Sequence, residues 1–373
     1  MCDLKKRNLK NLNKMGMAIK SAIIAFVFVA TNIQSFSNNV VKVNAVENAE
    51  NLFFFIEQNS YSDYYDLHIE DKRPAKEILI NGADYKTAIN GDFKKGDLDG
   101  KEDVLIWNSS EGKITYNINV PETGVYNMEL SYYPIESNTT SIELALLIDD
   151  EIPYGTASRI SLKKSWINEK EIITNARGNQ VRPSQIQKGR WMTTDLKDIE
   201  GLFNDPLCFY LEKGEHTISF DASKAYIGLE YFKFYNIEKL NSYQNVKPSE
   251  DEIKSTPSTL IRIEGENAKY KSDSTLYPTS DKSSYLASPS SPGKMMYNTI
   301  GALNWKKATQ SITWEIDSTA IKKDGWYKIG IKARQDVMRG FYSNRRLYVN
   351  EKVLYEEHDQ IKFFYDTDWN VIS

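Results

Sequence analysis

Cysteine and histidine are scarce in this chain, whose 373 residues include two cysteines and three histidines. Cys2 lies in an N-terminal segment that we expect to be removed on export, which leaves Cys208 as the one cysteine of the mature chain. An internal disulfide is then excluded, so stability must come from packing, with a bound metal as the other candidate source.

Motifs of catalysis are also lacking. The sequence contains no nucleophile elbow, glycine-rich phosphate loop, histidine-rich metal motif or cysteine nucleophile. Its histidines are His68, His216 and His358, and for His216, which flanks a predicted hairpin, a surface role suffices. The scattered acids could form a glycosidase pair, but no pattern marks one. We therefore expect that the chain is not an enzyme.

Net positive charge is confined to the N-terminal part of the chain. Residues 1–45 hold seven Lys or Arg and one Asp, a charge of +6, whereas the whole chain has −4, so the part after residue 45 has −10. Because nucleic-acid phosphates require a basic surface, this balance argues against a nucleic-acid partner.

The N-terminus is basic and then apolar. Six Lys or Arg up to Lys20 precede the apolar run 22–30, which is too short to span a bilayer comfortably. Residues 43–45 offer a small-residue cleavage pattern. We expect a signal peptide over 1–45 and a secreted or cell-surface protein, with an uncleaved membrane anchor as the alternative.

Aromatic residues are abundant, with 23 Tyr and 7 Trp. Such rings suit half-buried pleated surfaces, so β-sheet packing explains many of them. The alternative is that some rings are exposed as stacking platforms for a ligand.

Short alternating runs separated by turn signals predict an all-β first module over 77–237. Before it, residues 46–76 are predicted to contain a short helix capped by Ser60 or Ser62. A long insertion over 155–205 interrupts the strand rhythm, and this spacing without amphipathic helices indicates a sandwich or jelly roll. The predicted strands are 77–80, 103–107, 113–120, 124–133, 142–148, 207–211, 215–220 and 227–234.

A polar, Pro-containing stretch predicts a linker over 238–259, after which a second strand series runs over 260–373. The second series echoes the first: residues 113–132 have a counterpart at 311–332, and 146–154 at 347–355. We expect two tandem modules, with the second incomplete and the chain a fragment, because no counterpart of 167–237 follows Trp369.

Candidate ligand-binding residues lie in polar loops. The stretch 176–191 has four cations and no acid, so Arg177, Arg182 or Arg190 could contact glycan hydroxyls or a carboxylate while Trp191 stacks on a sugar ring. A solvated loop is the alternative. The other candidates are Trp166 in the insertion and, in the second module, Tyr297, Asn298, Trp305 and Tyr342, the last near Arg334, Arg339, Arg345 and Arg346.

The second module opens with Ile263, Glu264, Gly265, Glu266, Asn267 and Ala268. On a strand, Glu264 and Glu266 would project from the same face, which favours a hard cation; an ordinary solvent-facing pair is the alternative.

This opening, a strand–turn–strand ending in Gly-x-Tyr, and a Leu-x-Val-Asn-Glu strand together resemble carbohydrate-binding module families 6 and 35. The resemblance implies a galactose-binding-like β-sandwich in which Glu264 and Glu266 hold a structural calcium with an acid from a last strand. In the first module the corresponding stretch is 80–84, where both glutamates are replaced, so no calcium is expected there; Glu230 lies where the family has an Asp.

The tandem pairing after a signal peptide, with an insertion containing Trp166 and Arg182, resembles the N-terminal region of large solute-binding proteins of Gram-positive ABC sugar importers. That resemblance implies a polysaccharide or oligosaccharide partner, contact with the cell envelope, and a permease reached through a further C-terminal domain. The alternatives are the carbohydrate-binding region of a secreted glycoside hydrolase and a structural spacer without a ligand.

Overall fold

The computed structural model describes residues 60–255, 260–321 and 324–373, all within one compact unit, Ile56–Ser373. The predicted signal peptide and residues 46–59 of the predicted N-terminal segment lie outside the described residues. Within the described residues, no helix combines the length and apolar character needed to cross a membrane.

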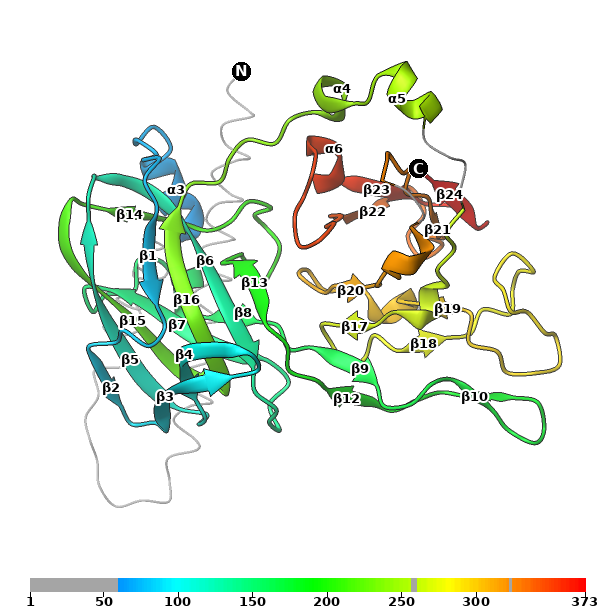
Figure 1. Ribbon diagram of the computed structural model, residues 1–373, viewed down its shortest axis with the longest axis horizontal. Helices are drawn as coiled ribbons and strands as arrows, with labels where there is room; N and C mark the ends of the chain where they lie inside the picture. Colours follow the sequence, from blue (N-terminus) through cyan, green and yellow to red (C-terminus); the bar gives the residue numbers. More distant parts are fainter. Residues whose placement is uncertain (1–59, 256–259, 322–323) are drawn as a thin grey trace, which may run out of the picture. The chain divides into compact units, whose positions relative to one another are not determined.

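Two antiparallel sheets form the first module, as predicted (Figure 1). The larger sheet has the order β13-β6-β16-β4-β3, with β1 added on β16 and β14 on β6; the smaller has the order β2-β5-β15-β7-β8. The larger sheet comprises β1 (Ile78–Asn81), β3 (Phe93–Leu98), β4 (Lys101–Trp107), β6 (Gly124–Pro134), β13 (Met192–Asp195), β14 (Cys208–Leu211) and β16 (Ile227–Tyr235). The smaller sheet comprises β2 (Thr87–Ile89), β5 (Gly112–Val120), β7 (Ile142–Ile148), β8 (Ile160–Leu162) and β15 (Gly214–Lys224).

The core lies between these sheets and follows from the period of two in their strands. Along β5, Ile114, Tyr116 and Ile118 are buried and alternate with more exposed residues. Aromatic rings fill the centre, where Phe232 meets Tyr116 and Phe220 edge-on at centroid distances of 4.9 and 5.3 Å. Every strand predicted for this module is present, with ends within a few residues of the prediction.

A short helix, α3 (Tyr61–Leu67), covers part of the sandwich. Ser60 caps it as predicted, because its hydroxyl accepts a hydrogen bond from the Asp63 amide. The Tyr61 hydroxyl accepts from the amide of Cys208, a buried free cysteine. The helix is therefore fixed by polar contacts as well as by packing.

The insertion forms strands rather than an irregular loop. After the 3-10 turn η1 (Gly155–Ser158), two strands of the insertion become edge strands of the sandwich. β8 is added to the smaller sheet and β13 to the larger sheet. Between them, Trp166–Gln187 form a two-stranded ribbon that we call the arm. The arm comprises β9 (Trp166–Asn168), β10 (Ile173–Thr174), β11 (Gln180–Val181) and β12 (Gln185–Gln187).

The predicted linker contains two short helices, α4 (Tyr243–Val246) and α5 (Glu250–Ser255). After it, the described residues of the second module form short strand pairs, β18–β19, β21–β24 and β22–β23, and the pair β17–β20 that joins the arm in a four-stranded sheet. The elements are η2 (Gly265–Asn267), β17 (Tyr270–Lys271), β18 (Pro278–Thr279), β19 (Thr299–Ile300), η3 (Ala302–Asn304), β20 (Ile312–Thr313), η4 (Ser318–Ala320), β21 (Ile331–Ala333), β22 (Tyr342–Arg345), α6 (Glu356–Asp359), β23 (Ile361–Phe364) and β24 (Asn370–Ile372).

One part of the sequence echo is reproduced in structure. Asp149 and Asp150 have φ of 51° and 64°, and Asn350 and Glu351 have φ of 50° and 67°. Each pair is closed by a single antiparallel bridge, so the two copies make the same tight turn. The echoed strand–turn–strand segment is a hairpin in neither copy. β5 and β6 belong to different sheets of the first module, and β20 pairs with β17 while β21 pairs with β24.

Candidate functional site

The larger sheet has a face that points away from the core and is covered by tyrosines and charged side chains. On β6, Met128, Leu130 and Tyr132 are buried in the core, whereas the alternate residues Glu129 and Tyr133 face outward. We call this surface the polar face, formed by Lys101, Glu129, Ser131, Tyr133, Trp191, Asp195, Glu230, Tyr231, Lys233 and Tyr235.

Trp191 lies at one end of the polar face in a fixed position. Its indole N–H donates to the backbone carbonyls of Leu98 and Asp99 at 3.1 and 3.2 Å. The ammonium of Lys101 lies 4.6 Å from the ring centroid, and the Tyr133 ring packs at 5.5 Å. These contacts hold the ring in place on the sheet. They use one edge and part of the indole surface, and the side chain remains half-buried.

Glu230 connects Trp191 to the centre of the polar face. Its carboxylate pairs with Lys101 and accepts a hydrogen bond from the Ser131 hydroxyl. The resemblance put Glu230 where the carbohydrate-binding module families have an Asp, with no calcium expected in this module; in the structure the carboxylate is held by the Lys101 ammonium group.

At the other end, tyrosine hydroxyls and carboxylates alternate. Tyr231 donates to Glu129 at 3.1 Å, and Tyr235 donates to Asp195 at 2.5 Å. Lys233 pairs with Glu129 at 3.3 Å. Burial, together with Glu129, raises the pKa of Tyr231 to about 12, so this hydroxyl remains a hydrogen-bond donor across the physiological range. None of these five residues was predicted as a site residue. The signal available for them was that, in strands with alternating burial, every second residue faces away from the core.

Two of the predicted cations of the insertion, Arg182 and Arg190, contact tyrosine rings of the second module, although Arg182 remains exposed. The Arg182 guanidinium lies 4.0 Å from the Tyr277 ring centroid, and that of Arg190 lies 4.7 Å from the Tyr270 ring centroid. Arg190 also pairs with Glu351 at 3.4 Å. A glycan would have to share or displace these contacts, so the ligand role of both arginines stays a prediction.

Trp166 lies at the start of the arm, where β9 pairs with β17. Its indole nitrogen is buried without a hydrogen-bond partner among the described residues. In the second module, Trp305 stacks with Arg345 at 4.5 Å, while the Tyr297 amide donates to Gln180 of the arm. Trp166, Trp305 and Tyr297 thus lie in different contacts and do not converge with Trp191 on one surface.

Asn298 and Tyr342 contrast in exposure. Asn298 is buried, and its amide nitrogen donates to the carbonyls of Asp281 and Pro289 at 2.9 and 2.8 Å, which is the environment of a loop-fixing residue. Tyr342 is 49% exposed on β22, against Phe364 and Lys362, and is the freest of the predicted rings.

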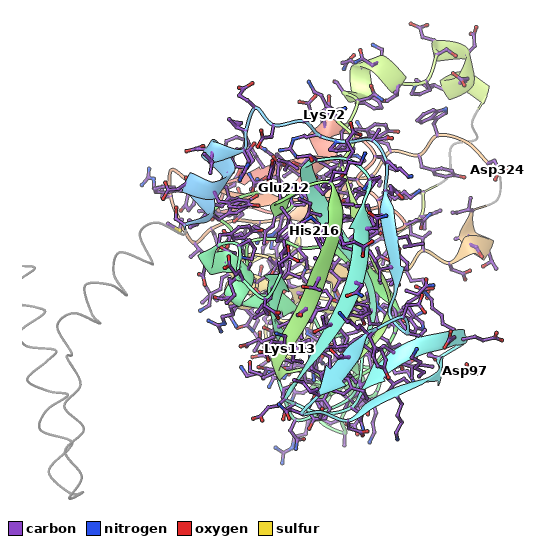
Figure 2. The ribbon with its side chains drawn as sticks, turned by 90° about the vertical axis from the view of Figure 1, so that its left-hand side faces the viewer. Lys72, Asp97, Lys113, Glu212, His216 and Asp324 are labelled. Atoms are coloured by element: carbon purple, nitrogen blue, oxygen red, sulfur yellow. The ribbon has the colours of Figure 1, made fainter. Side chains whose placement is uncertain are left out.

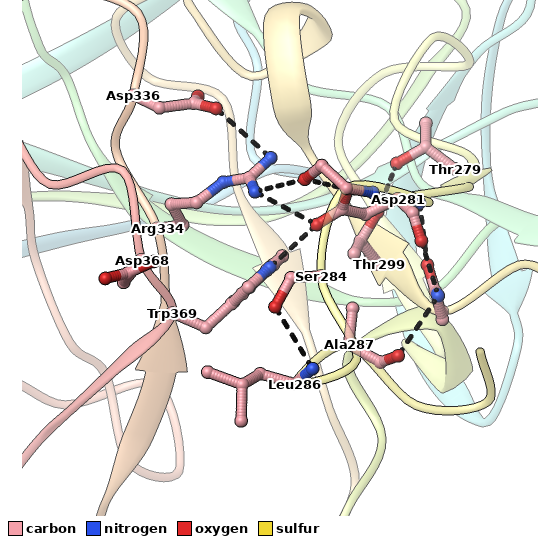
Figure 3. A network of polar contacts seen from close by, with 12 residues as sticks. Thr279, Asp281, Ser284, Leu286, Ala287, Thr299, Arg334, Asp336, Asp368 and Trp369 are labelled. Carbon is pink, nitrogen blue, oxygen red and sulfur yellow. Dashed lines mark hydrogen bonds and ion pairs between the residues drawn. The ribbon is translucent and has the colours of Figure 1, made fainter.

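A polar network around Asp281 fixes the same loop (Figure 3). Asp281 accepts from the Trp369 indole at 2.7 Å and pairs with Arg334 at 3.1 Å, and Arg334 also pairs with Asp336. Although burial opposes it, hydrogen bonds from Ser283 and Trp369 lower the pKa of Asp281. Trp369, the tryptophan to which the second copy runs, is therefore held against the Asp281 loop.

The predicted metal ligands do not lie on a strand. Glu266 lies in the 3-10 turn η2, Glu264 is the residue that precedes this turn, and β17 begins only at Tyr270, so the expected same-face geometry on a strand is wrong. Glu264 pairs with Arg262 at 2.7 Å, whereas Glu266 is 5% exposed and one of its oxygens has no partner in the described part of the chain. Burial raises the pKa of Glu266. Among the described residues, no group of three or more His, Cys, Asp or Glu could hold a metal ion.

His216 has a more specific environment than a hairpin flank requires. Its Nδ1 lies 2.6 Å from the Asp149 carboxylate. Its Nε2 lies 2.8 Å from the carbonyl of Glu212, which is labelled beside His216 in Figure 2. Both partners are acceptors, so the ring satisfies both only when each nitrogen has a proton. Burial alone would lower the pKa of His216, but these hydrogen bonds raise it above its ordinary value.

We expect the stabilisation by His216 to depend on pH. Because the folded pKa is raised, the contribution is complete below pH 6.5 and is lost as pH rises through the folded pKa. His216→Ala should cost about 1 kcal/mol at pH 6, since the half-exposed Asp149 weakens the pair. Urea unfolding of both proteins at pH 6 and pH 9 measures this difference. The role given to His216 would be contradicted if its replacement cost the same free energy of unfolding at pH 6 and pH 9. It would also be contradicted if Asp149→Asn kept the full pH dependence of the parent protein.

The strand pairing makes this chain an all-β protein whose largest part is a jelly-roll sandwich. Among solved structures it is similar to a family 35 carbohydrate-binding module from Clostridium thermocellum, with 14% identity over 44% of this chain and 100% of that chain and a TM-score of 0.25. The C-terminal CBM6 of LamC from Zobellia galactanivorans has 11% identity over 43% and 100% of the two chains and a TM-score of 0.26. The CBM35 from Cellvibrio japonicus Abf62 has 12% identity over 44% and 95% and a TM-score of 0.28.

At these identities and scores the likeness adds no argument about a ligand, and the fold class follows from the strand pairing of the chain itself. No model of a protein family matches the sequence, and neither does any curated protein.

Proposed function

We propose that this chain is a non-catalytic glycan-binding protein and that Trp191 and the polar face form its ligand surface. The observation that supports this most is the fixed indole of Trp191 beside Tyr133 and the Lys101–Glu230 pair. A flat ring covers the C–H face of a pyranose, and neighbouring charged groups hydrogen-bond its hydroxyls. The sheet provides rigidity, so little entropy is lost on binding.

Glycan-array screening followed by calorimetry tests the proposal. Trp191→Ala is expected to weaken binding by about 1–3 kcal/mol, and Trp191→Phe by less, because a ring is retained. Trp326→Ala, at an exposed tryptophan of the second module, is the matched control and should bind as the parent protein does. If no glycan binds, or if Trp191→Ala leaves affinity unchanged, the proposed surface is wrong.

Calcium bound by Glu264 and Glu266 is a second part of the proposal. The unpartnered oxygen of buried Glu266 supports it, since calcium favours carboxylate oxygens. Two carboxylates are an incomplete set for an ion that takes about 6–8 oxygens, so backbone or water oxygens would complete it. Calcium is expected to raise the Tm relative to EDTA, and Glu266→Gln to abolish that rise, whereas Glu315→Gln should preserve it. Equal Tm values in calcium and EDTA would refute the site.

The finer context we propose is the exported N-terminal part of a sugar-importer solute-binding protein that contacts the cell envelope and, through another domain, a permease. The tandem arrangement after a basic and apolar N-terminus supports it. Analysis of the native gene product tests it: a two-lobed α/β domain in the same polypeptide is expected, and a catalytic barrel would contradict it.

A further inference from the structure

Lys271 of β17 is buried against a side-chain amide of the arm. Only 2% of Lys271 is exposed, and its Nζ lies 2.8 Å from Oδ1 of Asn168, which ends β9. The two strands are neighbours, since Lys271 pairs with Trp166 in the ladder. The contact joins segments that are 103 residues apart.

The Lys271 amine has no acidic partner among the ion pairs of the described residues. A buried ammonium ion without a counter-ion is costly, which favours the neutral amine. Burial accordingly lowers the pKa of Lys271 from 10.5 to about 8. At mildly alkaline pH a substantial fraction of this lysine is therefore the neutral, nucleophilic form.

The Asn168 amide is polarised from a second side. Gln185, directly opposite in β12, donates its Nε2–H to the same Oδ1 at 2.8 Å. Two donors on one oxygen draw electron density from the attached Cγ, which is one carbonyl bond, about 1.2 Å, from Oδ1. With Nζ 2.8 Å from Oδ1, this carbon lies within about 4 Å of Nζ, and the ladder pairing of Lys271 with Trp166 keeps β17 beside the strand that holds Asn168.

We propose that Lys271 and Asn168 condense to an intramolecular isopeptide bond. The Nζ lone pair attacks Cγ of Asn168, and a tetrahedral intermediate forms whose oxyanion is stabilised by the Gln185 N–H. One proton passes from Nζ to Nδ2, the Cγ–Nδ2 bond breaks, and ammonia leaves. The product is a secondary amide between the two side chains, and no electrons are transferred to or from another molecule.

The bond would have a structural purpose. Within the described residues, the buried hydrophobic cluster belongs to the first module, the α3 helix and the insertion, and includes no residue of 260–373. A covalent tie from the arm to β17 would therefore fasten a segment that has few buried apolar contacts of its own.

Mass spectrometry of the folded, purified chain provides the first test. We expect an intact mass lower by one ammonia molecule than the sequence mass, and a cross-linked peptide containing Lys271 and Asn168. Lys271→Met and Asn168→Ala should each restore the sequence mass. Lys164→Met is the matched control, because Lys164 is equally buried but its shortest contact, at 2.5 Å, is the Ser137 hydroxyl; this variant should keep the mass loss.

A protease site inserted in the linker 238–259 provides a second test that does not depend on variant stability. After cleavage, the parent chain should run as one band under denaturing conditions, and Lys271→Met as two. An unmodified intact mass after incubation at pH 9, a cross-link mapped to other residues, or two bands from the parent chain would each overturn the proposal.

Discussion

Replacing Phe232 with alanine is expected to destabilise the sandwich by about 3–5 kcal/mol. Phe232 is fully buried on β16, with its ring edge-on to Tyr116, Phe220 and Phe234 at 4.9, 5.3 and 6.3 Å. Removing it eliminates the burial of a large apolar surface and leaves a cavity that the paired strands cannot close. Urea unfolding followed by tryptophan fluorescence measures the loss as a shift in midpoint.

Phe364→Ala is the matched control for this prediction. Phe364 is 67% exposed on β23, so its removal should change the stability by no more than about 0.5 kcal/mol. A loss for Phe364→Ala as large as that for Phe232→Ala would mean that the core is not where the strand pairing places it.

Shortening the arm is expected to release the loop 286–298 of the second module. Asn168 and Gln185 are directly opposite, so residues 169–184 can be replaced by Asn-Gly to close a two-residue hairpin. The change removes the hydrogen bonds of Gln180 and Asn179 to Met295 and Tyr297, at 2.5–2.9 Å, and the Arg182–Tyr277 stack. We expect the amides of Met295 and Tyr297 to exchange at least about tenfold faster, a change of about 1.4 kcal/mol.

Hydrogen exchange with mass spectrometry measures this effect, and the sandwich strands serve as an internal reference. Ile173→Ser with Val181→Ser is the control, because this cross-strand pair on the arm is 58% and 43% exposed and makes no hydrogen bond to the loop through its side chains. Unchanged protection in the shortened variant, or equal loss in the control, would contradict the role of the arm.

The strands of the first module were predictable because most of them bury one side. In β5 and β7 the apolar residues alternate with polar ones, and that period specifies both the strand and its inward face. β2, β3 and β13 were missed because they are short, polar and mostly at sheet edges, where no burial pattern marks them. The insertion was read as a loop for the same reason.

In the candidate site too, some residues were predictable from the sequence and others only from the structure. Trp191 was identified from its residue type, and the structure adds that Leu98, Lys101 and Tyr133 fix it. Glu230 and Tyr231 join it through pairing of strands about a hundred residues apart, which no local pattern reveals. Arg182 and Arg190 showed the converse, because two guanidinium groups of a cationic stretch that reads as a solvent-facing loop lie on tyrosine rings of the other module.

The sequence by itself determined the all-β class, the strands with alternating burial and the echo of residues 146–154 at 347–355, because side-chain period acts over a few residues. Only the tertiary structure decided which polar side chains meet. It placed Trp191 on the polar face, put Glu264 and Glu266 at a 3-10 turn instead of on a strand, and brought Lys271 against Asn168. The reason is that these contacts depend on strand register and on the path of the arm, which are set by pairings between distant segments.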